Sequence, residues 1–314
     1  MAGGTPRVPS EADSARASAV LGRWLVFFAT VFWGTTATLA RFVFRDRQVP
    51  ALTVVELRLA IATLVLLPWL AWRRPQALRI ERQDLGYFVV LGLFGVAAVQ
   101  GSYYFAISKL GVGLAILLQY LAPSLIVCWD LLRGRKPSAA MLAAVVLALV
   151  GTALLVRGVD PRTLHAKPLH WAISFASAFI FAFYILYSKR GLARYAPETV
   201  LVYTFGIAAV VWAIVTPPWA IVRAGYPADL WWIFLVLGLF STLVPFALFY
   251  AGLRRLPAAE AGVIATSEPL VAMLAAAAFL HEALLPLQFL GAGFVIAAAL
   301  LASRDKVASP APVN

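Results

Sequence analysis

Apolar residues fill most of this chain in long blocks, and short polar stretches separate the blocks. Ten blocks are about 20 residues long, which is the length that an α-helix needs to cross the ~30 Å core of a bilayer. The breaks between them carry residues that end helices, such as Pro50, the basic run 133–137 and Pro217. We therefore predict ten membrane spans, at residues 23–43, 51–72, 85–107, 112–132, 138–156, 169–188, 198–217, 230–252, 257–280 and 285–303.

The composition agrees with this pattern. Of the 314 residues, 62% are hydrophobic and 13% are charged, whereas about a quarter of the residues in a soluble domain are charged. A water-soluble core could not bury so much apolar surface, so the sequence predicts an all-α integral membrane protein.

The basic residues predict an orientation. If the N-terminus is cytoplasmic, the inside segments hold 17 Lys and Arg residues and the outside segments hold 8, with Arg58 left inside a span. Basic residues collect in cytoplasmic loops, so we expect both termini in the cytoplasm and a location in the cell inner membrane. The same rule accounts for the net charge of +12, and we expect no nucleic-acid partner.

One segment of the chain occurs twice. Residues 88–123 align without gaps to residues 234–269, and ten of the 36 positions are identical, including Tyr104 with Tyr250 and Pro123 with Pro269. Each copy belongs to a unit of five spans, so the second unit inserts upside down relative to the first. We predict two inverted five-helix repeats, the plan of many secondary transporters, with the limits 1–21 (disordered tail), 22–158 (first repeat), 168–304 (second repeat) and 305–314 (disordered tail).

The pattern resembles the drug/metabolite transporter superfamily, and within it the EamA-type ten-helix permeases. The resemblance rests on "FFATVFWGTTATLARF", "VVELRLAIA", "LQYLAPSL" and "TSEPLVAMLAAAAFLHEALLPLQFLGAGFVIAAALL", together with the duplication. It implies a carrier of small metabolites, similar to bacterial exporters of aromatic and other amino acids.

Glu268 is the sharpest candidate for a functional residue. It lies eleven residues after Pro257, or about 16 Å into its span at 1.5 Å per residue. An ionised carboxylate at that depth is costly unless it is paired, hydrated or protonated. Glu268 is therefore either a proton-coupling group or a carboxyl that locks helix packing, and its counterpart in the first repeat is Ala122.

Glu56 and Arg58 lie one or two turns into the second span. Residues two apart on a helix do not face each other, so each needs another partner or water. They are either interfacial charges whose heads reach the membrane surface or part of an extracellular gate.

Polar and aromatic side chains inside the spans form the other candidate set. Amide and hydroxyl groups in a bilayer need partners within the protein or a wet cavity, although small hydroxyl residues also serve helix packing. We expect the following residues to line a substrate cavity: Trp33, Thr36, Gln100, Tyr104, Gln119, Tyr120, Tyr184, Tyr250 and Thr266.

These features predict a secondary transporter, not an enzyme, that exports small zwitterions such as aromatic or other apolar amino acids by alternating access. The alternatives are a carrier of another metabolite or drug, a membrane-embedded enzyme, and a receptor or scaffold. One cysteine and three histidines leave little for a metal site, and we expect no cofactor. The expected partners are the substrate, membrane lipid and protons, and we expect a monomer.

Overall fold

The protein is described here by a computed structural model that covers residues 11–156, 166–280 and 284–304. Every regular element in these residues is helical. The helices are α1 (Glu11–Arg45), α2 (Ala51–Arg73), η1 (Pro75–Leu78), η2 (Arg82–Asp84), α3 (Leu85–Val90), η3 (Leu91–Ala97), α4 (Ala98–Gln119), α5 (Ala122–Leu132), α6 (Ala139–Leu155), α7 (Pro168–Leu192), α8 (Pro197–Val215), α9 (Pro218–Arg223), α10 (Ala228–Gly238), η5 (Leu239–Leu243), α11 (Val244–Arg255), α12 (Ala258–Ala265), α13 (Glu268–Leu280) and α14 (Pro286–Arg304).

These helices supply ten membrane-crossing segments in the described part of the chain. Eight helical stretches are long and apolar enough to cross a bilayer, and one of them, Arg82–Leu132, has 51 residues. Gly111 divides that stretch in two, because its φ of 82° and ψ of 163° are not helical and suit glycine almost alone. The tenth segment is α6, whose 17 residues reach the lower limit for a spanning helix.

The two repeats are irregular at matching places. In the first, the third span is π-helical over η3, and in the second the eighth span is π-helical over η5, on the shared "GLF" segment. The fourth span breaks between α4 and α5, and the ninth breaks between α12 and α13 at the aligned position. Thus the duplication seen in the sequence is also a duplication of helix breaks, and the fold is that of two inverted five-helix repeats.

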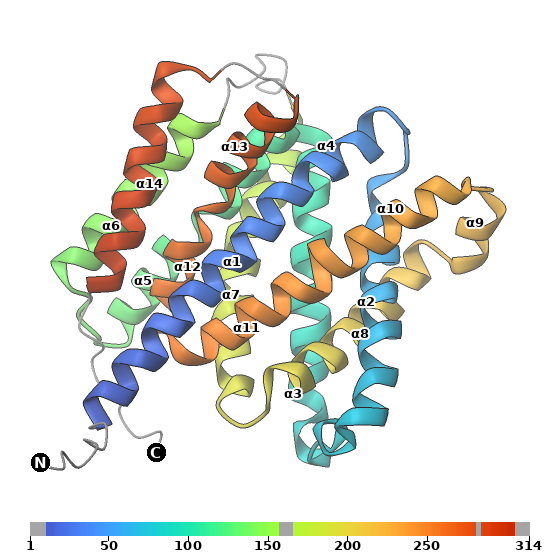
Figure 1. Ribbon diagram of the computed structural model, residues 1–314, viewed down its shortest axis with the longest axis horizontal. Helices are drawn as coiled ribbons and strands as arrows, with labels where there is room; N and C mark the ends of the chain where they lie inside the picture. The colour runs from blue at the N-terminus through green and yellow to red at the C-terminus, as the bar shows by residue number, and fades with distance from the viewer. Residues whose placement is uncertain (1–10, 157–165, 281–283, 305–314) are drawn as a thin grey trace, which may run out of the picture.

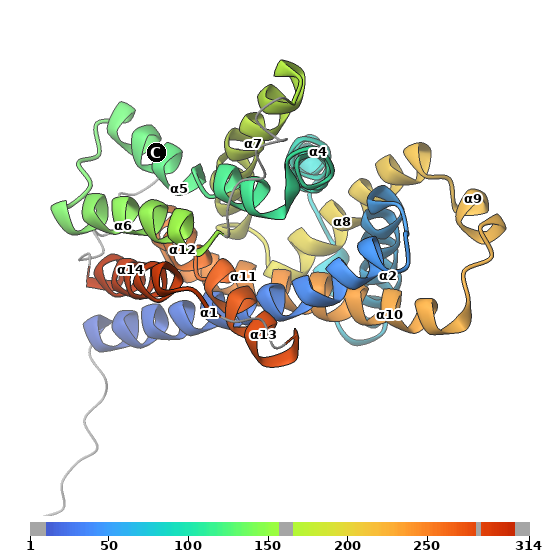
Figure 2. The ribbon, with the colours of Figure 1, turned by 90° about the horizontal axis from the view of Figure 1, so that it is seen from above.

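Each repeat packs mainly against the other. α1 lies along α11, α4 along α7, α2 along α8, and α6 along α14. The view from above shows α6 and α14 as a pair at one edge, with α2, α8 and α10 grouped at the opposite edge (Figure 2). A cavity on the axis between the repeats is therefore lined by helices from both.

Figure 1 shows that α1 begins and α14 ends on the same side of the bundle, which we call the terminal side. The helix α1 starts at Glu11, so residues 11–21, which we assigned to a disordered tail, are helical in the structure. The segment is rich in alanine, contains no proline or glycine before Gly22, and carries acidic residues in its first turn, where they favour the helix dipole. The expected C-terminal tail, 305–314, lies outside the described residues.

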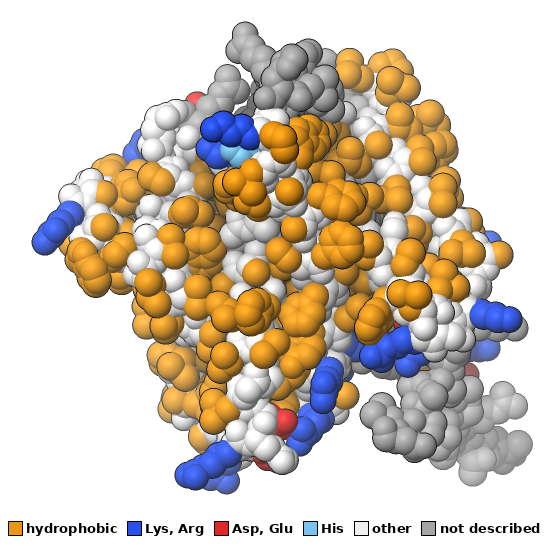
Figure 3. All heavy atoms as spheres, turned by 180° about the vertical axis from the view of Figure 1, so that it is seen from behind, with side chains coloured by type: hydrophobic (Ala, Val, Ile, Leu, Met, Phe, Trp, Pro, Cys, Tyr) orange, Lys and Arg blue, Asp and Glu red, His pale blue; other side chains and the backbone are white. Residues whose placement is uncertain are grey.

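The outer surface suits a bilayer. On the face shown in Figure 3, apolar side chains cover the middle, and Lys and Arg side chains gather at the margins. Large apolar residues such as Leu64, Trp72 and Ile214 are exposed on the outer surface of the protein. This distribution is the one expected of a protein whose middle faces lipid.

Candidate functional site

Arg58 is held inside the protein by residues from both repeats. Its Nε donates to Thr242 Oγ1 at 2.8 Å, one terminal nitrogen donates to the Ser241 carbonyl at 2.9 Å, and the other donates to the Tyr104 hydroxyl. The side chain is 5% exposed, and its guanidinium carbon lies 5.6 Å from the centroid of the Tyr104 ring. Ser241 and Thr242 belong to the π-helical segment η5, and such segments occur often at functional sites.

The expectation that Glu56 and Arg58 are interfacial charges with solvated heads is therefore wrong. Both are buried, Glu56 with 4% exposure, because α2 packs against α8, α10 and η5 at this level. Glu56 Oε2 has no hydrogen-bond partner among the described residues. Their assignment to an extracellular gate stays a prediction.

Glu268 lies at a break in its span. The helix α12 ends at Ala265, and the next two residues, Thr266 and Ser267, form a turn. Glu268 is the first residue of α13 and is followed by Pro269. A carboxylate in the first turn of a helix is favoured by the helix dipole. Half-helix ends of this kind line the substrate sites of transporters with broken helices.

Tyr120 meets Glu268 from the matching break in the first repeat. It follows the last residue of α4, and its hydroxyl donates to Glu268 Oε2 at 2.7 Å. Tyr120 is buried, whereas Glu268 is half-buried. The two helix breaks thus bring together one residue from each repeat.

Tyr103, which the sequence reasoning missed, is a further candidate residue near Glu268 and Arg58. It is half-buried and interacts electrostatically with Glu268, Tyr104 and Arg58. Arg58 also attracts the charge of Glu268, but the two do not form an ion pair. The adjacent tyrosines Tyr103 and Tyr104 were the signal in the sequence that could have identified it. We selected only Tyr104, because it aligns with Tyr250 in the second repeat.

Two glutamines carry unsatisfied groups in the interior. Gln100 Nε2 and Gln119 Oε1 are buried and have no hydrogen-bond partner among the described residues. A buried polar atom without a partner is costly, and such atoms mark places where water or a ligand supplies the missing bond.

Most of the aromatic candidates are connected in one layer of ring contacts, which we call the aromatic layer. Ring contacts run from Tyr120 to Phe181 (6.3 Å between centroids), from Phe181 to Tyr184 (5.9 Å) and from Tyr184 to Tyr250 (5.8 Å). Trp33 joins the layer through Phe246, 5.1 Å away. Four of the predicted site residues are thereby connected, in a part of the protein that is closely packed.

Two of the predicted site residues use their hydroxyls within their own helices. Thr36 donates to the Phe32 carbonyl and Thr266 donates to the Val263 carbonyl, each at 2.6 Å. A threonine in a helix satisfies its hydroxyl in this way without any ligand. The structure therefore does not bring these two hydroxyls to the site, although their predicted role stays a prediction.

The terminal side is closed by charged and polar contacts. Arg23 Nε pairs with Glu260 Oε1 at 2.7 Å, and Arg23 also donates to the Ser303 carbonyl at 2.6 Å. Lys189 donates to the Leu253 carbonyl at 2.7 Å and interacts electrostatically with Glu260. We call Arg23, Glu260 and Lys189 the terminal cluster. It joins α1, α7, α11, α12 and α14 beneath the aromatic layer.

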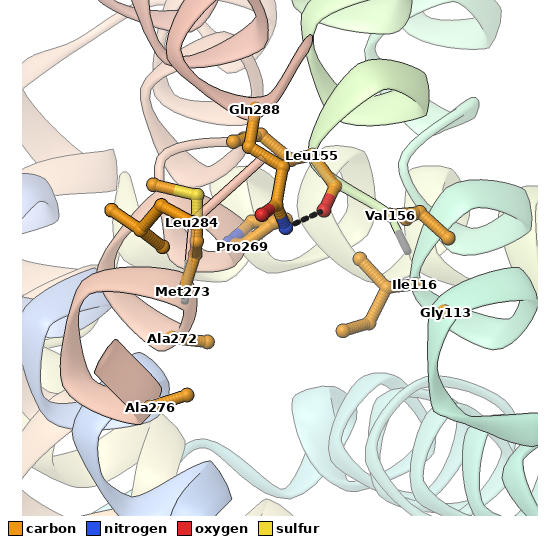
Figure 4. A pocket seen from close by; sticks show the side chains of 10 residues that line it. All are labelled: Gly113, Ile116, Leu155, Val156, Pro269, Ala272, Met273, Ala276, Leu284 and Gln288. Atoms are coloured by element: carbon orange, nitrogen blue, oxygen red, sulfur yellow. Dashed lines mark hydrogen bonds between the residues drawn. The ribbon is translucent and has the colours of Figure 1, made fainter. Parts of the chain in front are cut away.

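Beside Glu268 is an apolar pocket of about 160 Å³. Pro269 lines one wall directly after Glu268, and Ile116 lines the facing wall one helical turn before Tyr120 (Figure 4). Gln288 is polar, but its amide is satisfied by the carbonyl of Leu155 at 3.1 Å. The full lining is Gly113, Ile116, Leu155, Val156, Pro269, Ala272, Met273, Ala276, Leu284 and Gln288.

Comparisons with known proteins place this fold. A model of the EamA-like transporter family matches the chain twice, over residues 20–157 and 170–304. The chain is 31% identical over 286 residues to the threonine/homoserine exporter RhtA of Escherichia coli strain K12, with 88% of each chain covered. It is 26% identical over 287 residues to the uncharacterized inner membrane transporter YicL of Salmonella typhimurium strain LT2, with 89% of this chain and 94% of YicL covered.

The fold is similar to that of a solved crystal structure. It superposes with a TM-score of 0.72 at 20% identity and covers 91% of this chain and 96% of its own. The two matches of the family model coincide with the two structural repeats, and they leave out only the ends and the connection between them. The chain belongs to the EamA-like transporter family and is a multi-pass membrane transporter of the drug/metabolite superfamily.

Proposed function

We propose that this transporter exports neutral amino acids through the space between its two repeats. The observation that carries the proposal is that Arg58 of the first repeat and Glu268 of the second attract each other without forming an ion pair, and that half-buried Tyr103 interacts electrostatically with both. A neutral amino acid carries one positive and one negative charge, so a site with one residue of each sign suits it. A phosphorylated substrate would require several basic groups.

The pocket beside Glu268 suits the substrate's side chain. Its walls are apolar apart from Gln288, and small-molecule sites combine such walls with a few polar groups that fix orientation. This supports the prediction of aromatic or other apolar amino acids, and the similarity to the threonine/homoserine exporter RhtA adds threonine and homoserine to the candidates.

We further propose an inner-membrane location with both termini cytoplasmic, from the 17-to-8 distribution of basic residues. The terminal side is then the cytoplasmic side. In this proposal, the contacts of the terminal cluster form the closed cytoplasmic gate. Substrate release to the outside follows while this gate is closed.

The proposal is tested by expressing the protein in cells challenged with toxic analogues of Phe, Trp, Met and Thr. We expect resistance to at least one analogue, together with a lower intracellular concentration of it, because export removes the analogue. Cells that express Glu268→Gln at the same level serve as the control and are expected to stay sensitive.

Two results would contradict the proposal. Greater sensitivity of the expressing cells would show import. Unchanged sensitivity to all four analogues, with the protein shown to be folded and in the membrane, would exclude amino acids of this kind as substrates.

A further inference from the structure

Opposite charges from the two repeats attract each other inside the protein without forming an ion pair. Arg58 comes from α2 in the first repeat and Glu268 from α13 in the second. Each is held by a tyrosine, Tyr104 for the arginine and Tyr120 for the glutamate. They attract each other electrostatically but form no ion pair, so an unlike-charged group could enter beside each of them.

The guanidinium of Arg58 has donors to spare. Arginine carries five N–H groups, and three are used by Tyr104, Thr242 and the Ser241 carbonyl. All three partners are neutral, and no carboxylate in the described residues pairs with this arginine. A buried guanidinium without a counter-charge is costly, and two N–H groups on a planar fork match the geometry of a carboxylate.

The carboxylate of Glu268 also has unused capacity. One of its oxygens accepts the hydrogen bond from Tyr120, whereas an ionised carboxylate has about four acceptor positions. The residue is half-buried, and among the described residues Tyr120 is its one side-chain hydrogen-bond donor. Tyr103 also interacts electrostatically with this carboxylate, and tyrosine rings can attract a cationic ammonium.

We infer that Arg58 binds the carboxylate of the transported amino acid and Glu268 binds its ammonium group. This inference rests on the proposed function and deepens it, because it assigns each end of the zwitterion to one repeat. It makes Arg58 a specificity-determining residue instead of an outer gate. A substrate bound in this way bridges the repeats and replaces the missing counter-charge of each residue.

The test uses purified full-length protein and measures the binding of three forms each of phenylalanine and threonine. These are the free amino acid, its amide, which lacks the carboxylate, and its N-acetyl derivative, which lacks the ammonium. We expect the wild type to bind at least one free amino acid about tenfold or more tightly than either derivative, since hydrogen bonds to charged groups are strong.

The variants should separate the two ends of the substrate. In Arg58→Gln, the preference for acid over amide should fall towards one, while the preference for free over acetylated amine remains. In Glu268→Gln, the preference for free over acetylated amine should fall towards one, while the preference for acid over amide remains. Arg58→Lys keeps the charge and should retain part of the acid preference. Arg47→Gln, which changes an arginine paired with Asp229 away from the site, should keep both preferences.

Several results would overturn the inference. If the wild type binds an amide as tightly as the acid, the inference is wrong. This result does not depend on whether any variant folds. Equal weakening of acid and amide in Arg58→Gln would make this arginine a helix-packing residue. If the folded wild type binds neither phenylalanine nor threonine while exporting another class of compound, the proposed function itself fails, and the inference falls with it.

Discussion

At the residue scale, Glu268 combines two properties that a coupled carrier needs in one group. Its carboxylate is within the membrane-spanning part of the protein, and it accepts a hydrogen bond from a tyrosine of the other repeat. The groups that face it are the Tyr120 hydroxyl, Tyr103 and the positive charge of Arg58. If a proton and the ammonium group of the substrate both bind this carboxylate, they compete for it. Binding of one then displaces the other, so that a proton is exchanged for a substrate molecule.

The first prediction concerns this exchange. Glu268→Gln keeps the size and hydrogen-bonding shape of the side chain but removes the titratable proton, so we expect it to abolish transport driven by a pH gradient. The measurement is uptake or efflux in proteoliposomes with and without the gradient. Glu198→Gln, at an edge position paired with Arg74, is the control and should transport normally. Wild-type rates in Glu268→Gln would leave Glu268 with a packing role alone.

The second prediction concerns the terminal cluster. Glu260 has a side chain that is 1% exposed, and it pairs with Arg23. Arg23→Ala removes a cationic partner from this buried carboxylate, so we expect the free energy of unfolding to fall by up to about 3–5 kcal/mol. Thermal unfolding in detergent measures this change.

A double-mutant cycle provides the control for that prediction. Arg23→Ala combined with Glu260→Ala should be less destabilising than the sum of the two single changes, because the pair is removed together. The exposed pair Arg74 and Glu198 should show a coupling of only about 0–1 kcal/mol. Additive effects at Arg23 and Glu260 would mean that their ion pair does not stabilise this side of the protein.

At the scale of elements, the contact between α6 and α14 depends on two glycines. A β-carbon placed on Gly151 would lie 2.9 Å from the Gly291 carbonyl oxygen, and one placed on Gly291 would lie 2.8 Å from the Gly151 carbonyl oxygen. Both obstacles are backbone atoms, which cannot turn away. Small residues of this kind let membrane helices approach closely.

The third prediction follows from that contact. Gly151→Ala and Gly291→Ala should each lower the free energy of unfolding by about 1–3 kcal/mol, the usual cost of overpacking, as measured by thermal unfolding in detergent. Gly293→Ala on the same helix meets nothing within 4 Å and should lie within about 0.5 kcal/mol of the wild type. An equal effect at Gly291 and Gly293 would point to backbone entropy instead of contact.

At the scale of the whole molecule, the repeats interlock so that each long helix of one half lies on a helix of the other. Such an arrangement lets one half rock against the other about a shared site, which is the general motion of transporters with inverted repeats. Arg58 and Glu268 belong to different halves, so movement of one half against the other would change the contacts at both ends of a bound zwitterion.

The fourth prediction tests the orientation of the whole chain. Reporter fusions after Lys109 and His165 should report the outside, and fusions after Arg194 and Asp305 should report the cytoplasm, because of the distribution of basic residues. An outside signal at Asp305 together with a cytoplasmic signal at Arg194 would contradict the four spans expected between them, and with them the inverted repeat.

The sequence by itself determined the elements and their duplication. An apolar chain crosses a bilayer as helices, because every backbone polar group must be satisfied internally. The length of the apolar blocks and the helix-breaking residues between them were therefore enough to locate ten spans. The shared Pro123 and Pro269 predicted matching halves, and both lie just after the matching helix breaks. The depth of Glu268 followed from the rise per residue alone.

Only the tertiary structure decided which side chains meet. Arg58 and Thr242 are 184 residues apart in sequence, and Tyr120 and Glu268 are 148 apart. Hydropathy reports how apolar a segment is and says nothing of which neighbour it packs against, since lipid and a second helix are equally apolar. For that reason the sequence placed Arg58 at the membrane surface, whereas the packing of α2 against the second repeat buries it beside Tyr104.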